Sequence, residues 1–499
     1  MSKRGYTFVN TKLPENALNF SRHSRYVRET ILERVYPHKV IIPMKQHFGV
    51  DAVPVVEHGD TVTIGQCIGM PAPNTFSVPV HASISGIVKE VKKITLPNGV
   101  VTSAVVIESD NKRTFHQSIR PRTNIDIDAK TVTGIVKNAG IVGMGGEGIP
   151  TVAKINRARK YKVKDLLVNC LQSEPYATCD LYRVSEYADY VVMGAVALAG
   201  ATGAQNIRFC ISRERSYEIG ALTEAISRVK EEYYGMKFEI LQFKERFPQG
   251  YYRLIARAVY GVEVDMNEIL EDKVGAVLFN CSTCNAVWEA VADNMPMVNR
   301  IITVTGDTSE GHNVMVPIGT PISDLLGKVD MIYTANKIVW GNALTGLSTG
   351  DMETPIIKTT SAVTVIKRLE SPKTPCMHCG MCYDACPMDI VPSITARLIE
   401  NGENETAIAE NALKCISCGA CSYICPAGID LTKTISTFAM ANRHKEDTPV
   451  TVDHFKTVSK INIGDVSLLE TFEYADEEND GASNEGDELI LPFEGGKRV

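Results

Sequence analysis

The chain has 499 residues, 44% of them hydrophobic, and a formal net charge of −7. The length predicts three or four domains with several cores, and the negative charge excludes a general affinity for nucleic acid or anionic lipid. The sequence starts without an apolar signal region, and no stretch approaches the roughly 18 uninterrupted apolar residues of a membrane span. We therefore expect a cytoplasmic protein with reduced thiols that reaches a membrane, on its cytoplasmic face, only through a partner.

Residues 1–35 are taken as an N-terminal extension, and residues 36–120 show short alternating strands separated by tight turns such as HGD and ISG. This pattern resembles the barrel-sandwich fold of lipoyl and biotinyl carriers. Those carriers present a modified lysine at a hairpin tip, whereas the corresponding region here reads PAPNTFS, without lysine. We therefore expect a structural domain or a docking surface.

Residues 121–265 alternate between strand and helix patterns, which predicts a parallel sheet covered by helices. Segments 164–170, 189–195, 207–212 and 237–243 are typical of buried strands, and 215–235 is typical of a long amphipathic helix. The longer run 190–204, rich in Gly and Ala, fits a buried helix instead. The expected unit is a Rossmann-like α/β domain.

Residues 266–360 are mixed, with strand-like segments at 274–280, 300–307 and 313–319, and are expected to form a linker and a small β-grasp-like α+β domain. A cysteine-rich domain is expected over 361–445. The remaining residues, 446–499, are acidic and poor in apolar side chains, which indicates a partly disordered tail.

Eight of the fourteen cysteines repeat one spacing, C-x2-C-x2-C-x3-C-P. This is the run of bacterial ferredoxins, in which three cysteines of one motif and the fourth of the other bind each [4Fe–4S] cluster. One predicted ligand set is Cys376, Cys379, Cys382 and Cys425, and the other is Cys415, Cys418, Cys421 and Cys386. Zinc sites do not repeat such a run, and the chain's size and context exclude a disulfide framework. The sequence thus predicts a 2[4Fe–4S] ferredoxin-type domain that carries electrons.

A glycine-rich loop, GMGGEGIPT, occupies residues 143–151. As an ordinary NAD-binding loop it is a poor match, because no strand precedes it and Asp165 opens the following strand instead of closing it. A purely structural turn is a second interpretation. Glycines also allow a backbone to approach a planar ring, and a helix N-terminus with Pro150 in its first turn favours a phosphate.

The chain resembles the RnfC family of the Rnf electron-transport complex and, more distantly, the NADH-oxidising flavin subunit of respiratory complex I. The resemblance rests on the glycine loop and on blocks in the family's order. These are VNCLQSEPYATCD (168–180), FPQGYYRLIARAVYGVEV (247–264), RIITVTGD (300–307), IGTPISDLL (318–326) and the two cysteine motifs. It implies FMN bound at the loop by Gly143, Gly145, Gly146, Gly148 and Lys154, joined by Asn169 and Glu174, with NADH as the substrate.

The sequence departs from that family at several positions. Glu147 and Ile149 replace an alanine and a phenylalanine, and Gln172 replaces a carboxylate. Cys281 and Cys284 form a C-x2-C where the family has no cysteine. After a buried strand and at a helix start, such a pair favours a lowered pKa and reversible disulfide chemistry. The alternatives for Cys281 and Cys284 are half a metal site, contact with a partner's redox centre, or plain core packing. Cys170 and Cys179 are a further pair of cysteines that we expect to be neighbours.

The sequence therefore predicts a multidomain α/β oxidoreductase in which NADH, FMN and two [4Fe–4S] clusters exchange electrons. Its partners are other electron-transfer proteins. One hypothesis is the NAD-side subunit of a membrane Rnf complex. A second is a soluble donor to a dedicated reductase, similar to the proline reductase-associated protein. A third is a flavin-free iron–sulfur module that only docks partners.

Overall fold

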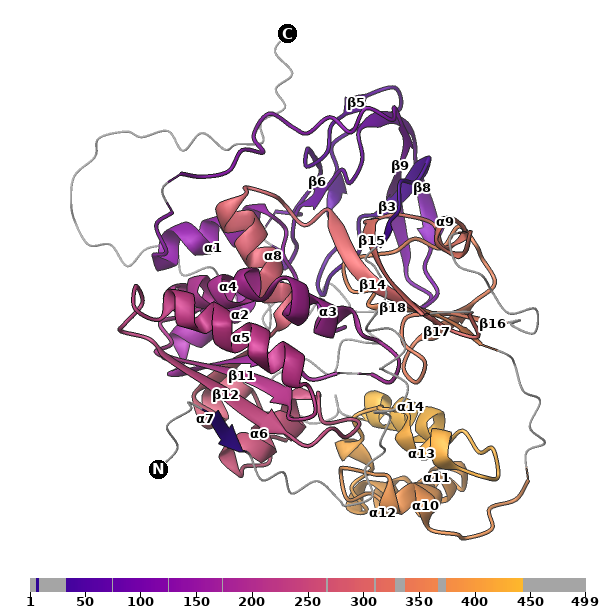
Figure 1. Cartoon of the computed structure of the whole chain (residues 1–499). Helices are drawn as coiled ribbons and strands as arrows, with labels where there is room; N and C mark the ends of the chain where they lie inside the picture. Colours follow the sequence, from indigo (N-terminus) through magenta and orange to yellow (C-terminus); the bar gives the residue numbers. More distant parts are fainter. Residues whose placement is uncertain are drawn as a thin grey trace.

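The computed structural model describes residues 6–8, 33–73, 75–123, 125–172, 174–265, 268–308, 311–327, 337–366 and 374–442. These residues form a β domain, an α/β domain, a mixed-sheet domain and a helical cysteine-rich domain (Figure 1). The predicted acidic tail and most of the predicted N-terminal extension lie outside the described residues.

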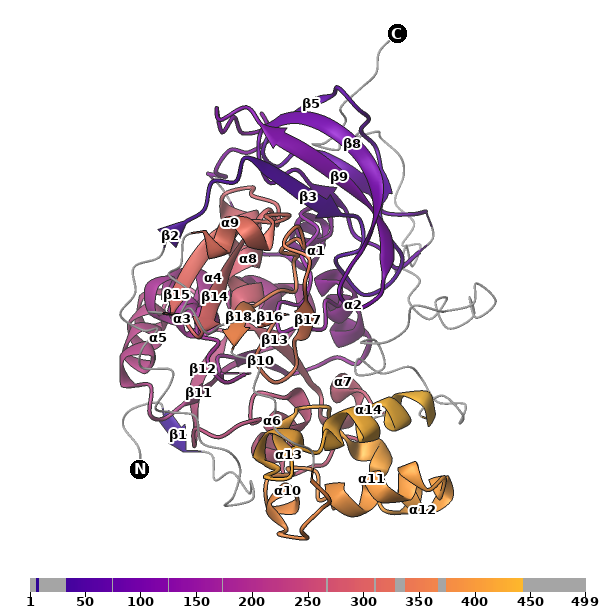
Figure 2. The same cartoon turned by 90° about the vertical axis from the view of Figure 1, so that its right-hand side faces the viewer.

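Two antiparallel sheets form the β domain, which stands at the top of Figures 1 and 2. One sheet has the order β3-β9-β8-β5, with β3 Lys39–Pro43, β5 Thr61–Val62, β8 Gly86–Thr95 and β9 Val101–Ser109. The other has the order β4-β6-β7, with β4 Val53–Pro54, β6 Cys67–Met70 and β7 Val80–His81. Inward side chains of both sheets, such as Ile42, Ile68 and Val88, share one core. This is the predicted barrel-sandwich arrangement.

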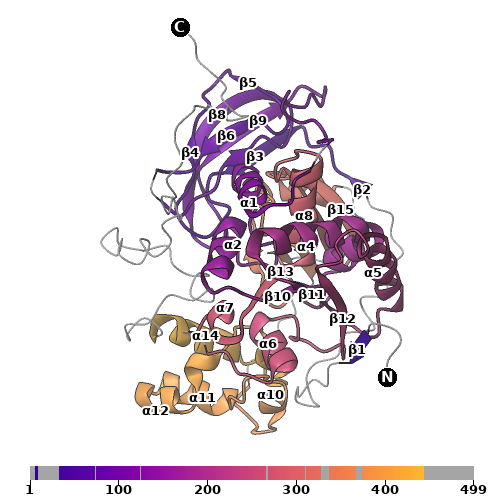
Figure 3. The same cartoon turned by 90° about the vertical axis from the view of Figure 1, so that its left-hand side faces the viewer.

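The α/β domain is built on a parallel sheet of order β1-β12-β11-β10-β13. Its strands are β1 Tyr6–Phe8, β10 Asp165–Asn169, β11 Asn206–Ser212, β12 Lys237–Phe243 and β13 Ala276–Asn280. Its helices are α1 Ala129–Asn138, α2 Thr151–Lys160, α3 Cys179–Glu186, α4 Ala188–Thr202, α5 Ser216–Val229, α6 Tyr252–Tyr260, α7 Leu270–Val274 and α8 Cys281–Ala292. Successive strand residues face opposite sides, as the pleat requires. Helices α1, α4, α5 and α8 pack on one face, and α6 and α7 on the other (Figure 3).

The strand expected at 189–195 is wrong, since this segment lies within α4. The alternative interpretation, a buried helix, is correct. A short apolar run does not distinguish a buried strand from a buried helix, but α4 is fifteen residues long and mostly apolar, and eleven of its residues are buried. Gly194 lets α4 approach α8, because a Cβ at this position would lie 1.8 Å from the carbonyl oxygen of Cys284.

The mixed sheet has the order β17-β16-β18-β14-β15-β2. Its strands are β2 Glu33–Arg34, β14 Asn299–Gly306, β15 His312–Pro317, β16 Lys337–Trp340, β17 Leu347–Thr349 and β18 Ala362–Ile366, and helix α9 is Ile322–Leu326. Two predicted domain boundaries need correction. The boundary at 265/266 assigned β13 and α8 to this domain, but β13 pairs with β10. The boundary at 360/361 assigned β18 to the cysteine-rich domain, but β18 pairs with β14 and β16.

Short helices carry the two cysteine motifs, drawn in orange and yellow in Figure 1. They are α10 Met381–Asp384, α11 Pro392–Glu400, α12 Asn404–Ala409, η1 Ala412–Lys414, α13 Ala420–Ile424 and α14 Leu431–Asn442. Helices α11 and α14 pack against each other and close a small core between the motifs.

Lys358 joins the three larger domains. Its fully buried ammonium group donates hydrogen bonds to the carbonyl oxygens of Pro79 in the β domain (3.0 Å) and Gly140 in the α/β domain (2.7 Å). Burial lowers the pKa of Lys358 to about 7. No helix within the described ranges is both long and apolar enough to cross a lipid bilayer.

Candidate redox sites

The eight motif cysteines line two separate cavities, four cysteines in each. The first, here called the inner site, is lined by Cys386, Cys415, Cys418 and Cys421. The second, the outer site, is lined by Cys376, Cys379, Cys382 and Cys425. Each cavity therefore takes three cysteines from one motif and the last cysteine of the other. Because four thiolates are the ligand set of a [4Fe–4S] cluster, the residues present fit one cluster in each cavity.

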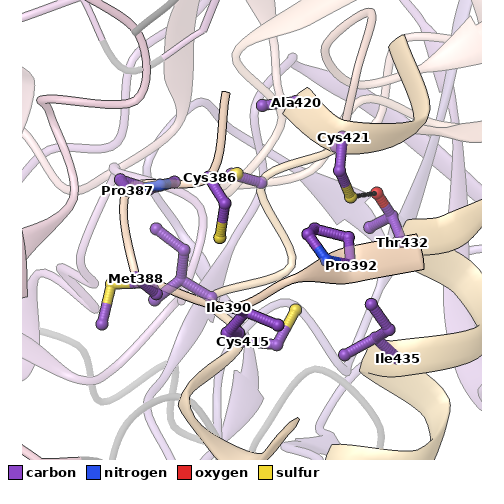
Figure 4. Close-up of a pocket in the computed structure, with 13 residues that line it drawn as sticks. Cys386, Pro387, Met388, Ile390, Pro392, Cys415, Ala420, Cys421, Thr432 and Ile435 are labelled. Atoms are coloured by element: carbon purple, nitrogen blue, oxygen red, sulfur yellow. Dashed lines mark hydrogen bonds between the residues drawn. The ribbon is translucent and has the colours of Figure 1, made fainter. Parts of the chain in front are cut away.

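Figure 4 shows the inner site, with the side chains of Cys386, Cys415 and Cys421 around one space. Thr432, in the first turn of α14, lies 3.2 Å from the sulfur of Cys421. Within the described part of the chain, no three His, Cys, Asp or Glu side chains are placed to hold a single metal ion. A [4Fe–4S] cluster takes one cysteine for each of its four iron atoms, which matches the four cysteines that line each cavity. Ligation by these particular cysteines stays a prediction.

The two sites differ in their surroundings. At the outer site Cys376 and Cys379 are exposed, whereas each inner cysteine is buried or half-buried. The inner site packs against Phe247, Tyr251 and Leu254 of the α/β domain. Leu344 of the mixed-sheet domain closes it from another side. The inner site thus lies where three domains meet, and the outer site opens to solvent.

The glycine loop lies between α1 and α2, beside the end of β13 and the start of α8. The backbone N–H of Met144 donates to Thr283 Oγ1 (3.0 Å), and a Cβ at Gly145 would lie 3.8 Å from Asn280 Cβ. Gly145 and Gly146 are exposed. Gly146 has φ of +108°, and a Cβ there would meet no atom within 4 Å. The loop therefore presents bare backbone at the carboxyl edge of a parallel sheet, where α/β domains bind ligands.

Helix α2 starts directly after the loop, and its first amides suit an anion. Among the described residues, the buried hydroxyl of Thr151 at its start has no hydrogen-bond partner. Lys154 is half-buried, and its ammonium donates to the carbonyl oxygen of Leu278 and lies 5.1 Å from the ring centroid of Phe279. Burial lowers the pKa of Lys154, and the negative charge of Glu147 opposes this shift. With the bare loop, these groups fit the phosphate and ring of FMN.

Asn169 and Glu174 lie at and beyond the end of β10, and their hydrogen bonds run to other parts of the protein. Asn169 donates to the carbonyl oxygen of Gly250 (2.9 Å) and accepts from the N–H of Leu171 (3.0 Å). Glu174 accepts a hydrogen bond from Thr345 (2.5 Å). Asn169 therefore holds the segment that packs on the inner site, while Glu174 ties the α/β domain to the mixed-sheet domain. Direct contact of either residue with FMN stays a prediction.

The three departures from the resembled family have different consequences. The carboxylate of Glu147 opposes the lowering of the Lys154 pKa by burial, so its charge favours the charged lysine. Ile149 is only 5% exposed, so its side chain belongs to the interior. The amide oxygen of Gln172 accepts from Arg215 (3.4 Å), whose guanidinium also pairs with Glu245 (2.5 Å).

Cys281 and Cys284 open α8, as predicted, but both are fully buried. Burial raises the pKa of each thiol well above its ordinary value. The expected lowering is therefore wrong, because desolvation outweighs the helix dipole. Burial also rules out direct contact of this pair with a partner protein. Cys179 does not pair with Cys170 either, since its thiol faces the carbonyl oxygen of Ser361 (3.4 Å).

Two groups near the glycine loop were not foreseen. Arg300, fully buried, donates to the carbonyl oxygen of Met144 (2.9 Å) and so fixes the loop from β14. Asp180 accepts from Asn280 (2.8 Å) and Ser282 (2.6 Å) and fixes the first turn of α8. Both act across elements distant in sequence, so no local pattern could identify them.

Comparison with known proteins supports these assignments. Residues 21–112 match the RnfC barrel sandwich hybrid domain, residues 136–289 the Nuo51 FMN-binding domain, and residues 375–429 a 4Fe-4S dicluster domain. The chain is 33% identical to the C subunit of the Na(+)-translocating ferredoxin:NAD(+) oxidoreductase complex of Acetobacterium woodii, over 76% of this chain and 85% of that protein. It is 30% identical to the C subunit of the proton-translocating complex of Clostridium ljungdahlii, over 72% and 79%.

A solved structure of an NAD+-reducing [NiFe]-hydrogenase in the H2-reduced state is a weaker match. It has a TM-score of 0.48 and 16% identity, over 67% of this chain and 64% of that one. The fold, the family models and the two cysteine-lined cavities define an electron-transfer flavoprotein with FMN and two [4Fe–4S] clusters. More narrowly, the chain belongs to the RnfC family.

Proposed function

We propose that this chain is the NAD-side subunit of a ferredoxin:NAD-type electron-transport complex and passes electrons from NADH to a partner protein. In this proposal the outer site delivers the electrons to that partner. The observation that carries the proposal is the unequal placement of the two cysteine-lined cavities. The inner site packs on the α/β domain, and the outer site reaches the surface.

The proposed flavin site is the glycine loop. Gly143, Gly145, Gly146 and Gly148 would give the ring access to the backbone, and Lys154 would hold the phosphate with the first turn of α2. FMN, when bound, accepts two electrons as hydride and releases them singly. Asn169 connects this region to the inner site, because its bond to Gly250 anchors the segment that includes Phe247 and Tyr251.

The proposed partner is another electron-transfer subunit on the cytoplasmic side, where NADH is available; the relatives' names, which describe subunits of oxidoreductase complexes, support this proposal. The apolar side chains Met377, Met381 and Tyr383 around the outer site are 59%, 40% and 50% exposed. Exposed apolar side chains grouped at one place mark protein contacts. An exposed apolar surface would also suit a soluble reductase as the partner. The two partners are distinguished by which of them accepts electrons from the purified chain.

The experiment is an anaerobic NADH titration of the flavin- and iron-loaded chain, followed by visible absorbance, with two glycine variants. Gly146→Ala should weaken FMN binding at least about tenfold, roughly 1.4 kcal/mol, because its Cβ would occupy the open face of the loop. Gly99→Ala is the matched control, since Gly99 also has positive φ (+81°) and open surroundings but lies in the β domain. Equal FMN affinity in both variants would place the flavin elsewhere, and a flavin that NADH leaves oxidised would refute the function.

A further inference from the structure

Two neighbouring strands of the α/β sheet end in the same dipeptide. Strand β10 ends with Asn169 followed by Cys170, and β13 ends with Asn280 followed by Cys281. The strands are parallel and paired in register, with Asn169 opposite Asn280. Adjacent parallel strands lie about 4.8 Å apart. The register thus brings Cys170 and Cys281 side by side at the carboxyl edge of the sheet.

The side chains of these two cysteines belong to the same buried cluster on one face of the sheet, and each thiol affects the pKa of the other. The sulfur of Cys281 also lies 3.7 Å from the carbonyl oxygen of Asp180. Disulfides need a Cα separation of roughly 4.4–6.8 Å, and the two cysteines directly follow paired strands whose usual spacing of about 4.8 Å falls in that range. Cys284, one turn further along α8, is influenced by Cys281 and, in the opposite direction, by Lys154.

The thiol pair is sealed from outside reagents. Cys170 is 1% exposed and Cys281 fully buried, and burial raises the pKa of both. Thiol–disulfide exchange requires an accessible thiolate. Exchange with glutathione or a partner's cysteines is therefore blocked, and any redox change of this pair must use electrons that arrive through the protein.

The glycine loop is the redox site next to this pair. The loop contacts Asn280 and Thr283, which stand immediately before and two residues after Cys281. Arg300 of β14 also holds this side of the loop, since it donates to the Met144 carbonyl. Electrons delivered at the loop therefore arrive beside the two thiols.

We propose that Cys170 and Cys281 form a reversible disulfide that stores two electrons from NADH. In the reductive direction the Sγ–Sγ bond breaks, and each sulfur gains one electron and one proton. NADH is oxidised to NAD+ and supplies the electron pair and one proton as hydride, and solvent supplies the second proton. The inference rests on the proposed function, because the glycine loop is the entry point of these electrons.

The competing explanation for Cys170 and Cys281 is that they only fill space in the core. Cys210 is an example of a cysteine in that role. Cys210 lies on β11, next to β10, and is as buried as Cys281. It packs in the apolar cluster on the opposite face of the sheet. Cys210→Ser is therefore the matched control, and Cys170→Ser and Cys281→Ser are the test variants.

The test is peptide mapping of the holoprotein under anaerobic conditions. The chain is oxidised with ferricenium, a one-electron acceptor that can draw electrons out through the clusters and flavin without touching the thiols. Part of the sample is then reduced with NADH, and free thiols are alkylated in denaturant before digestion. We expect a cross-linked peptide pair that contains Cys170 and Cys281, present after ferricenium and lost after NADH. It should persist in Cys210→Ser and be absent from both test variants. The wild type should also consume one more equivalent of NADH than Cys170→Ser before the flavin is fully reduced.

Alkylation of both thiols after ferricenium would overturn the inference, as would a Cys281–Cys284 link or a link that survives NADH while the flavin loses its visible absorbance. An NADH-inert flavin is a failure of the proposed function instead. In that case the flavin is reduced with dithionite instead of NADH, and the peptide mapping is repeated. Loss of the link then supports the pair's coupling to the flavin, and its survival overturns it.

Discussion

The inner and outer cluster sites are built from the same motif but stand in different environments. One cysteine of each motif is buried, Cys382 in the first and Cys418 in the second. Around them, however, the inner site is enclosed by side chains of two other domains, whereas two of the outer cysteines face solvent. One motif thus produces an interior site and a surface site, and tertiary contacts outside the motif make the difference.

The largest expected effect separates the ligand sets of the two sites. Cys425→Ser should damage the outer cluster, and Cys386→Ser the inner one, because each last cysteine lines the other motif's cavity. Each variant should retain about four of roughly eight iron atoms per chain. Iron analysis and EPR of the reduced proteins measure this. Loss in Cys425→Ser of the cluster bound by Cys415, Cys418 and Cys421 would refute the crossed arrangement.

A second effect concerns the exposed side chains at the outer site. Tyr383→Lys should slow electron transfer to the protein partner at least about tenfold, since large apolar side chains at an interface centre often dominate binding. Transfer from NADH to a small dye should stay unchanged. Tyr234→Lys is the control, because Tyr234 is 91% exposed in the α/β domain, away from both cavities. Equal rates for both variants would remove the outer site from the partner interface.

A smaller effect compares the equivalent glycines of the two motifs. Gly380 and Gly419 have nearly the same φ, +79° and +82°. A Cβ at Gly380 meets open space, but one at Gly419 would lie 2.9 Å from the carbonyl oxygen of Leu344. Gly380→Ala should cost roughly 1 kcal/mol of backbone strain, and Gly419→Ala about 1–3 kcal/mol more from overpacking. Thermal unfolding of the cluster-loaded variants measures the difference, and equal costs would show that the inner site is not tightly docked.

The smallest effect concerns charges between the cysteine-rich and α/β domains. Asp389 lies 3.7 Å from Arg257, and Lys414 lies 4.0 Å from Glu263. Both pairs are largely exposed, and exposed pairs contribute little. Asp389→Asn should therefore change stability by less than about 0.5 kcal/mol. A change above roughly 2 kcal/mol in denaturant unfolding would mean that charge, not packing, docks the inner site.

The sequence predicted those parts of the sites that depend on local patterns. The repeated cysteine spacing identified both cavities' linings, and the alternating segments identified most of the parallel sheet. The sequence-based predictions were wrong where contacts between distant parts of the chain determine the structure. Burial reverses the expected pKa shift of Cys281, the length of α4 turns a predicted strand into a helix, and β13 joins a sheet from which a domain boundary had separated it. The contact between Cys170 and Cys281 depends on strand register, which no single segment encodes.

The central claim is that electrons from NADH reach the inner site before the outer site, and stepwise reduction tests this order most directly. Cys418→Ser disrupts the inner site, and Cys379→Ser the outer site; each is treated first with NADH and then with dithionite, with EPR after each step. We predict that NADH reduces the remaining inner cluster in Cys379→Ser. In Cys418→Ser the remaining outer cluster should stay oxidised with NADH and become reduced only with dithionite. Reduction of that outer cluster by NADH at the wild-type rate would contradict the account.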